Sequence, residues 1–273
     1  MVDEQPPRPP SEKDVVGGVL PESARQGWHK VLVDGHERLR LAHRLFRHLP
    51  SAPRCKLCHN PFGGVGGHLV GLFGFRPSRK NPNLCTRCCD SLPPGGIEVD
   101  TAVLFADVRG STALSERVGP AEFARRMNQF YRTATEVLIR HDAIIDKLIG
   151  DEVMAFFVAG ISGPDYRRRA ALGAVELVQN LALGSTLPVG ASVVAGPAFV
   201  GNVGADHVVD FTALGDPVNT AARLQAQAGP GEVVLAEDVY GEVDDRFPRA
   251  EARRLAVRGR SAPVDVRVVR TTI

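Results

Sequence analysis

The sequence of 273 residues lacks a long apolar run and any segment of the kind that directs a chain into a membrane. The longest uncharged stretch beside the cysteines, Pro61–Phe75, is glycine-rich and shorter than the roughly 20 residues that a spanning helix needs. The first residues are charged and proline-rich, with no apolar core of a secretory signal. We therefore expect no transmembrane segment and a cytoplasmic protein.

Aromatic residues and an excess of charge of one sign are scarce as well. The net charge of +2 predicts no particular partner, although Lys and Arg outnumber Asp and Glu by eleven to three between His29 and Asp90. Aromatic residues make up 6% of the chain, which is too few for a platform that stacks the bases of single-stranded nucleic acid. No nucleic-acid partner is expected.

Cysteine is rare, but its spacing is informative. Four of the five cysteines form two CxxC pairs, Cys55/Cys58 and Cys85/Cys88. Two such pairs in a reducing compartment are typical of a metal site rather than of a disulfide scaffold. Four thiolates around a tetrahedral Zn²⁺ are the simplest arrangement.

Alternatives to this zinc site stay open. An iron–sulfur cluster also uses four thiolates, and the cysteines could be reduced structural residues without a metal. His59 or His68 could replace one cysteine, and Cys89 is a spare thiol or an alternative ligand.

Composition divides the chain into three parts. Residues 1–27 are rich in Pro, Glu and Ser and predict a disordered tail. Residues 28–92 hold an amphipathic helix, at about Asp34–Leu49, and the cysteine-rich module. After a Pro- and Gly-rich linker, residues 97–273 alternate helical and strand patterns.

The third part predicts a regular order of elements. Its β-α-β-β-α-β order predicts an α+β sandwich of the ferredoxin-like kind. The expected strands are Thr101–Ala106, Ala143–Ile149, Glu152–Val158, 187–195, 197–203, 207–213 and Val264–Arg270, and the expected helices are Glu122–His141, Pro164–Leu183 and Pro217–Gln227.

A first motif joins a strand to a helix. The strand ends at Asp107, and Gly110, Ser111 and Thr112 then open a helix. A carboxylate at this place can hold a metal ion while free backbone N–H groups hold a phosphate. The alternative is that Ser111 or Thr112 caps the helix and Asp107 is a solvated loop acid.

A second motif lies in a predicted hairpin. Lys147 precedes the turn Gly150-Asp151. If the hairpin pairs beside the first strand, Asp107 and Asp151 converge, and two carboxylates with substrate phosphates are ligands that Mg²⁺ prefers. The alternative is that Gly-Asp serves only the turn.

A third motif lies on a predicted helix that begins near Pro217. Asn219 and Arg223 are four residues apart and share one face. An amide and a guanidinium side by side suit a ribose oxygen and a phosphate that gains negative charge. The alternative is an ordinary exposed helix face.

The three motifs, FADVRGST, KLIGDEV and LGDPVNTAARL, together resemble the catalytic domain of class III adenylate/guanylate cyclases over about residues 97–271. The resemblance implies that Asp107 and Asp151 bind two Mg²⁺ or Mn²⁺ ions per active site. It implies that Lys147 reads the purine, and that Asn219 and Arg223 stabilise the transition state.

Two further positions follow from the same resemblance. Thr212 occupies the second purine-reading position, where many members have Asp, and so resembles a subclass of which some members respond to bicarbonate. The turn Arg258-Gly259-Arg260 resembles a late basic element that contacts the terminal phosphates, and either arginine could serve.

The resemblance implies an adenylate cyclase that makes cyclic AMP from ATP as a head-to-tail homodimer, with the cysteine module as a regulator or a structural clip. Adenine accepts at N1, which suits the donor-only Lys147. The alternatives are a guanylate cyclase or a non-catalytic regulator that binds nucleotide.

Overall fold

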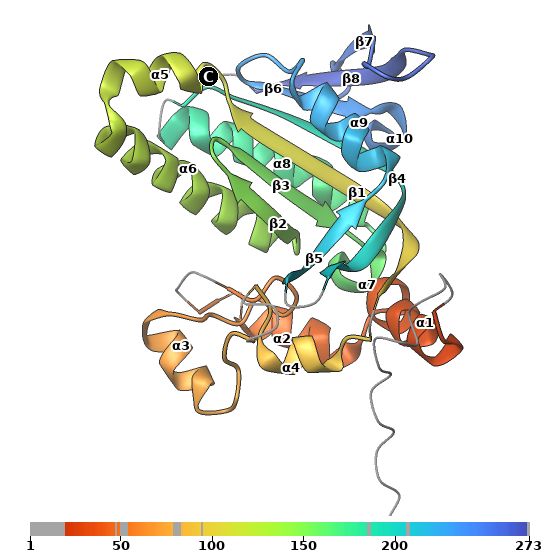
Figure 1. The fold of residues 1–273 in the computed structure, drawn as a ribbon. Coiled ribbons are helices and arrows are strands. Elements are labelled where there is room, and N and C mark those ends of the chain that lie inside the picture. The colour runs from red at the N-terminus through yellow and green to blue at the C-terminus, as the bar shows by residue number, and fades with distance from the viewer. Residues whose placement is uncertain are drawn as a thin grey trace, which may run out of the picture.

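The computed structural model describes residues 20–46, 48–49, 54–78, 83–93, 95–184, 187–205 and 208–271 (Figure 1). From residue 96 onward the chain forms a mixed sheet with helices on both faces. The preceding helices gather at one end of that sheet (Figure 1). Within the described ranges, no helix is both long and apolar enough to cross a membrane.

The sheet has eight strands in the order β2-β3-β1-β4-β6-β8-β7, with β5 paired to β4. The part β2-β3-β1-β4 has the β-α-β-β-α-β connectivity that the sequence predicts, and the α+β fold class is confirmed. The pair β4–β6 is parallel. The strands are β1 (Gly96–Val108), β2 (Ile144–Ile149), β3 (Glu152–Phe157), β4 (Val189–Ala205), β5 (Val208–Leu214), β6 (Glu232–Ala236), β7 (Glu251–Leu255) and β8 (Val264–Arg270).

Helices cover the sheet from two sides. The long helices α6 and α8 pack side by side against one face, and α9 packs on β1 and β4 from the other (Figure 1). Ser192 of β4 faces α9, because its hydroxyl donates to the carbonyl oxygen of Ala221 at 2.7 Å. The helices are α5 (Ser111–Val118), α6 (Pro120–Arg140), α7 (Ala159–Ser162), α8 (Tyr166–Gly184), α9 (Asp216–Gln225) and α10 (Glu237–Tyr240).

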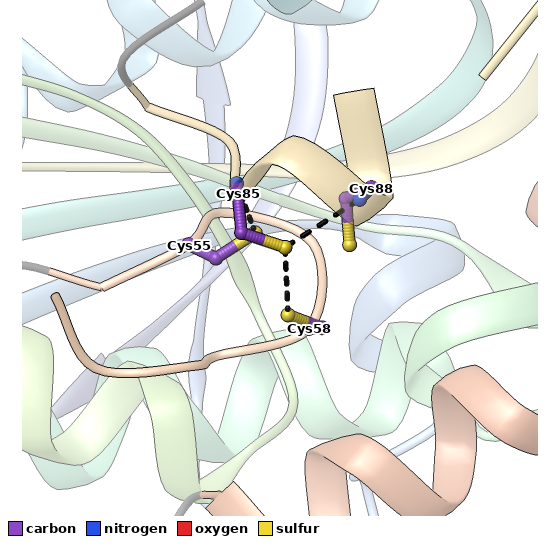
Figure 2. A group of neighbouring side chains, drawn as sticks. All are labelled: Cys55, Cys58, Cys85 and Cys88. Carbon is purple, nitrogen blue, oxygen red and sulfur yellow. Dashed lines mark hydrogen bonds between the residues drawn. The ribbon is translucent and has the colours of Figure 1, made fainter. Parts of the chain in front are cut away.

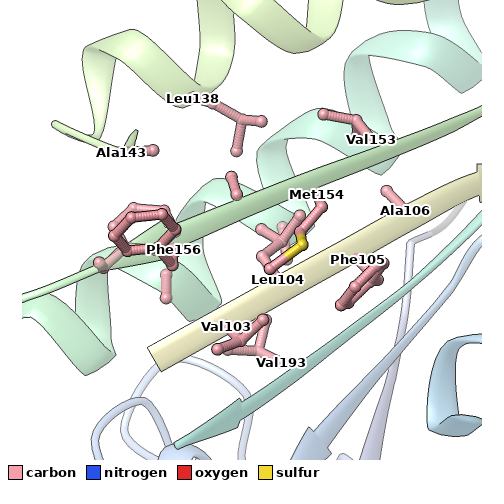
Figure 3. Close-up of a cluster of buried hydrophobic side chains, with 14 of the residues drawn as sticks. Val103, Leu104, Phe105, Ala106, Leu138, Ala143, Val153, Met154, Phe156 and Val193 are labelled. Atoms are coloured by element: carbon pink, nitrogen blue, oxygen red, sulfur yellow. The ribbon is translucent and has the colours of Figure 1, made fainter. Parts of the chain in front are cut away.

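Strand β1 lies at the centre of the core. Val103, Leu104 and Ala106 are fully buried, and Leu104 lies opposite Ala155 of β3 on one side and Val193 of β4 on the other (Figure 3). Because both faces of this strand are covered, its sequence is a continuous apolar run rather than an alternation. The buried strand fixes the position of the residues that follow it.

The prediction of two strands at 187–195 and 197–203 is wrong, because β4 is continuous. Pro197 lies within it, opposite Asp100 of β1. Residues 191–193 pair with β6 and residues 199–205 pair with β5, so Pro197 falls in an interval where the described sheet has no strand at that edge of β4. The missing N–H of proline therefore interrupts no ladder there.

The N-terminal module (residues 20–93) docks on the sheet through an aromatic contact. Trp28 is fully buried and stacks on Phe211 of β5, with ring centroids 5.9 Å apart. This contact explains why a helix begins at Glu22, inside the segment 1–27 predicted as a disordered tail; residues 1–19 lie outside the described ranges. The elements of the module are α1 (Glu22–His29), the π-helical turn η2 (Lys30–Asp34), α2 (Glu37–Phe46), α3 (Gly64–Gly71) and α4 (Thr86–Ser91).

Candidate active site and cysteine cluster

Asp107 and Asp151 meet where β1 ends and the β2–β3 hairpin turns. Asp107 lies opposite Glu152 in the register of β1 with β3. The backbone N–H of Val108 donates to the carbonyl oxygen of Asp151 at 3.0 Å. The hairpin thus pairs beside the first strand and brings the two predicted carboxylates together.

Neighbouring side chains hold these carboxylates in place. Arg109 forms an ion pair with Asp107, and the Ser111 hydroxyl donates to the carboxylate of Asp151. The N-cap of α5 is Gly110, in the left-handed conformation with φ 71°, and it makes no side-chain capping bond. The capping alternative therefore does not describe Ser111, whose hydroxyl is directed to the carboxylate instead.

The site carries an excess of negative charge. Burial raises the pKa of Asp107; the positive charge of Arg109 opposes this rise and the charge of Asp151 adds to it. Burial, together with Asp107 and Asp151, likewise raises the pKa of Glu152. A divalent cation would balance this charge, and an all-oxygen donor set suits Mg²⁺ or Mn²⁺.

Lys147 of β2 and Thr212 of β5 also lie side by side. The Lys147 ammonium donates to the Thr212 hydroxyl oxygen at 3.2 Å. The Lys147 side chain is 38% exposed, whereas Thr212 is buried. The Thr212 hydroxyl donates in turn to Asp146 at 2.6 Å. The two predicted purine-reading residues therefore form one hydrogen-bonded pair.

This pair has two acidic neighbours that were not among the predicted site residues. Asp146 and Asp210 lie 3.3 and 3.1 Å from the Lys147 ammonium. Burial lowers the pKa of Lys147, but these two carboxylates outweigh burial and raise it. Asp210 and Thr212 are two residues apart on a strand and so share a face. This spacing could have placed Asp210 beside Thr212 from the sequence alone.

A β-bulge explains how the side chains of Asp146 and Lys147, which are adjacent in the sequence, come to lie on the same side of β2. Successive side chains of a regular strand point to opposite faces, but the pairing of β2 with β3 shifts between Ile145 and Lys147. With this extra residue, both side chains reach the Thr212 hydroxyl, which donates to Asp146 and accepts from Lys147. The sequence carries no visible signal for this bulge.

Asn219 and Arg223 are both exposed on α9, and Arg223 lies beside the turn at 258–260. A Cβ at Gly259 would lie 3.4 Å from the Arg223 guanidinium, and Gly259 has a left-handed φ of 80°. Arg260 lies 3.1 Å from Asp216. The predicted transition-state pair and the late basic turn therefore form a third group.

The cysteine cluster consists of Cys55, Cys58, Cys85 and Cys88. Their sulfur atoms all lie within 4.8 Å of one another, and all four residues are buried (Figure 2). The first pair comes from a loop and the second from the start of α4 (Figure 2). Hydrogen bonds with Cys55, then with Cys58 and Cys88, hold the pKa of the Cys85 thiol well below its ordinary value. Cys85 is thus favoured as thiolate, which is the form that binds metal, whereas hydrogen bonds with the neighbouring cysteines raise the pKa of the Cys58 and Cys88 thiols.

The spacing of the sulfurs fits a single ion. Tetrahedral Zn²⁺ with Zn–S bonds of about 2.3 Å separates its sulfurs by about 3.8 Å. The Cys58 and Cys85 sulfurs are 3.7 Å apart. An iron–sulfur cluster places several atoms between its cysteines and so needs a wider frame.

The residues considered as alternative metal ligands contact other groups or lie outside the cluster. His59 Nε2 is 3.1 Å from the carbonyl oxygen of Ala143, and His68 Nδ1 is 2.9 Å from that of Gly64. Cys89 is not among the four clustered cysteines. The four-sulfur set predicted from the two CxxC pairs is the one that the structure assembles.

Known proteins match the larger part of the chain. Residues 98–268 match the family model described as the adenylate and guanylate cyclase catalytic domain. An uncharacterised protein of Mycobacterium tuberculosis is 32% identical over 201 residues, which are 71% of this chain and 36% of that protein. A second one from the same species is 31% identical over 178 residues, 63% of this chain and 31% of that protein. The chain thus spans about a third of the length of these relatives.

Solved structures of both cyclase types are similar to this fold. The adenylyl cyclase CyaB of P. aeruginosa is 27% identical with a TM-score of 0.57, over 65% of this chain and 97% of that one. The guanylyl cyclase Cya2 is 25% identical with a TM-score of 0.55, over 64% and 93%. The choice of base must therefore be argued from side chains rather than from the fold.

Proposed function

Because the chain belongs to the adenylate and guanylate cyclase catalytic-domain family, we propose that it converts ATP to 3′,5′-cyclic AMP and pyrophosphate. The observation that carries ATP rather than GTP is the hydrogen bonding of Lys147 and Thr212. All three groups that the reaction needs are present in one chain: carboxylates for metal, a pair for the base, and an amide with a guanidinium for the reacting phosphate.

The base-reading pair is arranged for adenine. The single hydrogen of the Thr212 hydroxyl is used on Asp146, because a carboxylate can only accept. The hydroxyl oxygen accepts from Lys147 and keeps a lone pair for the N6 amino group of adenine. The Lys147 ammonium donates to Asp146, Asp210 and Thr212, and it can exchange one of its bonds to a carboxylate for a bond to N1. Guanine would place its N1–H against the ammonium and its O6 against the lone pair, so both contacts would be unfavourable.

Asp107 and Asp151 are the residues that would hold two Mg²⁺ or Mn²⁺ ions together with the triphosphate. Such ions, when bound, lower the pKa of a coordinated hydroxyl and balance phosphate charge. The free backbone N–H groups at the start of α5, around Gly110, Ser111 and Thr112, can donate to phosphate oxygens.

The side chains of α9 act on the reacting centre. Asn219 orients the ribose so that its 3′-oxygen is placed to attack the α-phosphorus. Arg223 balances the charge that develops on the α-phosphoryl oxygens as pyrophosphate leaves. Arg260, which Asp216 holds against α9, and Arg258 are suited to the terminal phosphates.

The active sites lie between two copies of the chain in this proposal. Leu148, Ile149 and Leu214 are 41%, 60% and 47% exposed beside the site residues, which suits a surface that a second copy covers. A head-to-tail homodimer would build each site from both chains. One chain supplies Asp107 and Asp151, and the other supplies Lys147, Thr212, Asn219 and Arg223.

The cysteine cluster holds Zn²⁺ in this proposal. Burial of four sulfurs at the spacing of a tetrahedral ion supports zinc over an iron–sulfur cluster. Four cysteines that are not joined in disulfides are typical of a reducing compartment, and we therefore place the protein in the cytoplasm.

The product and the base preference test the function. Purified chain with Mg²⁺ or Mn²⁺ is expected to form cyclic AMP, with kcat/KM for ATP at least about tenfold above that for GTP. Thr212→Val removes the acceptor for N6 and should lower kcat/KM for ATP about tenfold. It also removes one unfavourable contact with guanine O6, so the slow GTP reaction should not become slower. Cyclic GMP as the main product would make the chain a guanylate cyclase. Nucleotide binding without either product would make it a non-catalytic regulator.

A further inference from the structure

Lys56 connects the cysteine cluster to the base-reading pair. It lies between Cys55 and Cys58, and its backbone N–H donates to the carbonyl oxygen of Asn83 at 2.9 Å, so the loop of the second cysteine pair fixes its backbone. Its side chain is only 7% exposed and leaves the module. The ammonium lies 3.0 Å from Asp146 and 3.0 Å from Asp210.

These contacts form a closed group of four charges. Asp146 and Asp210 are shared by two ammonium groups, those of Lys56 and Lys147. The Asp146 side chain is fully buried, and a buried carboxylate is costly unless it is paired. With Lys56 in place, two negative charges meet two positive charges. Without it, the same two carboxylates would be left to Lys147 and to the Thr212 hydroxyl.

The charge balance of this group affects how readily Lys147 can donate a hydrogen bond to a nucleotide base. Lys147 is the partly exposed ammonium, and it must keep a donor for the base. If two carboxylates depended on it alone, they would hold it inward and compete with the base for its hydrogens. Lys56 forms ion pairs with the same two carboxylates from the side that faces the protein interior, so Lys147 is not their only positively charged partner.

The module is anchored on the same two strands around this group. Trp28 stacks on Phe211, which directly precedes Thr212 in β5. His59 is 3.1 Å from the carbonyl oxygen of Ala143, at the entry to β2. The module therefore fixes the backbone of both base-reading strands and not only one side chain.

We propose that Lys56 is a positioning residue for base recognition, which acts on Lys147 and Thr212 through Asp146 and Asp210. This inference rests on the proposed function in so far as Lys147 and Thr212 read the base. It makes the cysteine-rich module part of the nucleotide site, with the loop of the first CxxC pair as the connecting piece.

The test compares Lys56→Met, which keeps an unbranched side chain one atom shorter and removes its charge, with Lys30→Met at an exposed lysine of the same module. Binding of a fluorescent ATP analogue and steady-state kinetics are measured on the full chain. Lys56→Met is expected to raise Kd and KM about tenfold, with kcat changed less than about threefold. Lys30→Met should match the wild type, and both variants should keep the metal content of the wild type.

A second variant distinguishes charge balance from general damage. Lys56→Met/Asp210→Asn removes one charge of each sign and is expected to recover most of the lost affinity, a coupling that independent sites would not show. A Kd for Lys56→Met within twofold of the wild type would overturn the proposal. So would a loss of affinity that the second substitution leaves unrepaired. A wild type that binds the analogue but forms no cyclic AMP contradicts the proposed function alone, because the change in Kd is measured without turnover.

Discussion

Replacing Asp107 by asparagine is expected to lower the rate of cyclic nucleotide formation by about a hundredfold or more. Asp107 lies near the end of the central strand β1, beside Asp151 and Glu152, where negative charge accumulates. The amide keeps the volume of the side chain and removes the charge that a divalent cation requires. The protein should therefore stay folded while it loses metal-dependent turnover.

The matched control for this variant is Asp100→Asn on the same strand. Asp100 is an exposed residue that pairs with Arg167 on the surface, so its loss should change turnover less than about twofold. Rates are measured with ATP and Mg²⁺ or Mn²⁺, and circular dichroism checks the fold. Equal rates for Asp107→Asn and the wild type would remove Asp107 from the metal site.

Replacing Cys85 by serine is expected to abolish metal binding in the N-terminal module and to lower the melting temperature by roughly 10 °C. Cys85 is central to the cluster, because its sulfur accepts hydrogen bonds and its thiol has a strongly lowered pKa. A serine hydroxyl is a poor replacement for a thiolate. Besides this cluster and Trp28, the described part of the module buries only a few large apolar side chains, such as Leu32, Leu57 and Leu84, so loss of the ion should loosen it.

Cys89→Ser is the control, since Cys89 is adjacent in α4 yet stands outside the four-sulfur set. Elemental analysis of the purified chain should find one zinc per chain in the wild type and in Cys89→Ser, and none in Cys85→Ser. Iron with acid-labile sulfide in the wild type would show that a cluster occupies the site. A metal-free wild type that melts at the same temperature as Cys85→Ser would contradict a metal site altogether.

The parts of the site that could be predicted from the sequence are those that local patterns specify. An apolar run followed by Asp107 marks the end of a buried strand, and Gly150-Asp151 between two apolar runs marks a hairpin turn. The CxxC spacing brings the two sulfurs of each pair together, one pair on a loop and the other at the start of α4. Each of these signals spans only a few residues, and the fold then brings them together.

The parts that escaped prediction depend on tertiary packing. Lys56 reaches Asp146 across 90 positions of sequence, and nothing near either residue indicates the other. The bulge that turns Asp146 toward Lys147 is a property of strand pairing. The break at Gly196, between strands predicted at 187–195 and 197–203, does not occur: β4 is continuous, and Pro197 lies where one edge of it has no strand partner in the described sheet. Patterns of single elements do not encode such neighbours.

Mixing two inactive variants tests the account of a shared active site most directly. Asp107→Asn removes a metal-binding carboxylate, and Arg223→Ala removes the guanidinium that stabilises the transition state. A homodimer of either variant therefore has two defective sites. In a head-to-tail dimer, a mixed pair carries both lesions in one site and leaves the other site intact. Co-expression of the two is therefore expected to restore about a quarter of the wild-type formation of cyclic AMP, since half of the dimers are mixed and each has one of two sites. A mixture that stays as inactive as either variant alone, beside an active wild type, would contradict sites built from two chains.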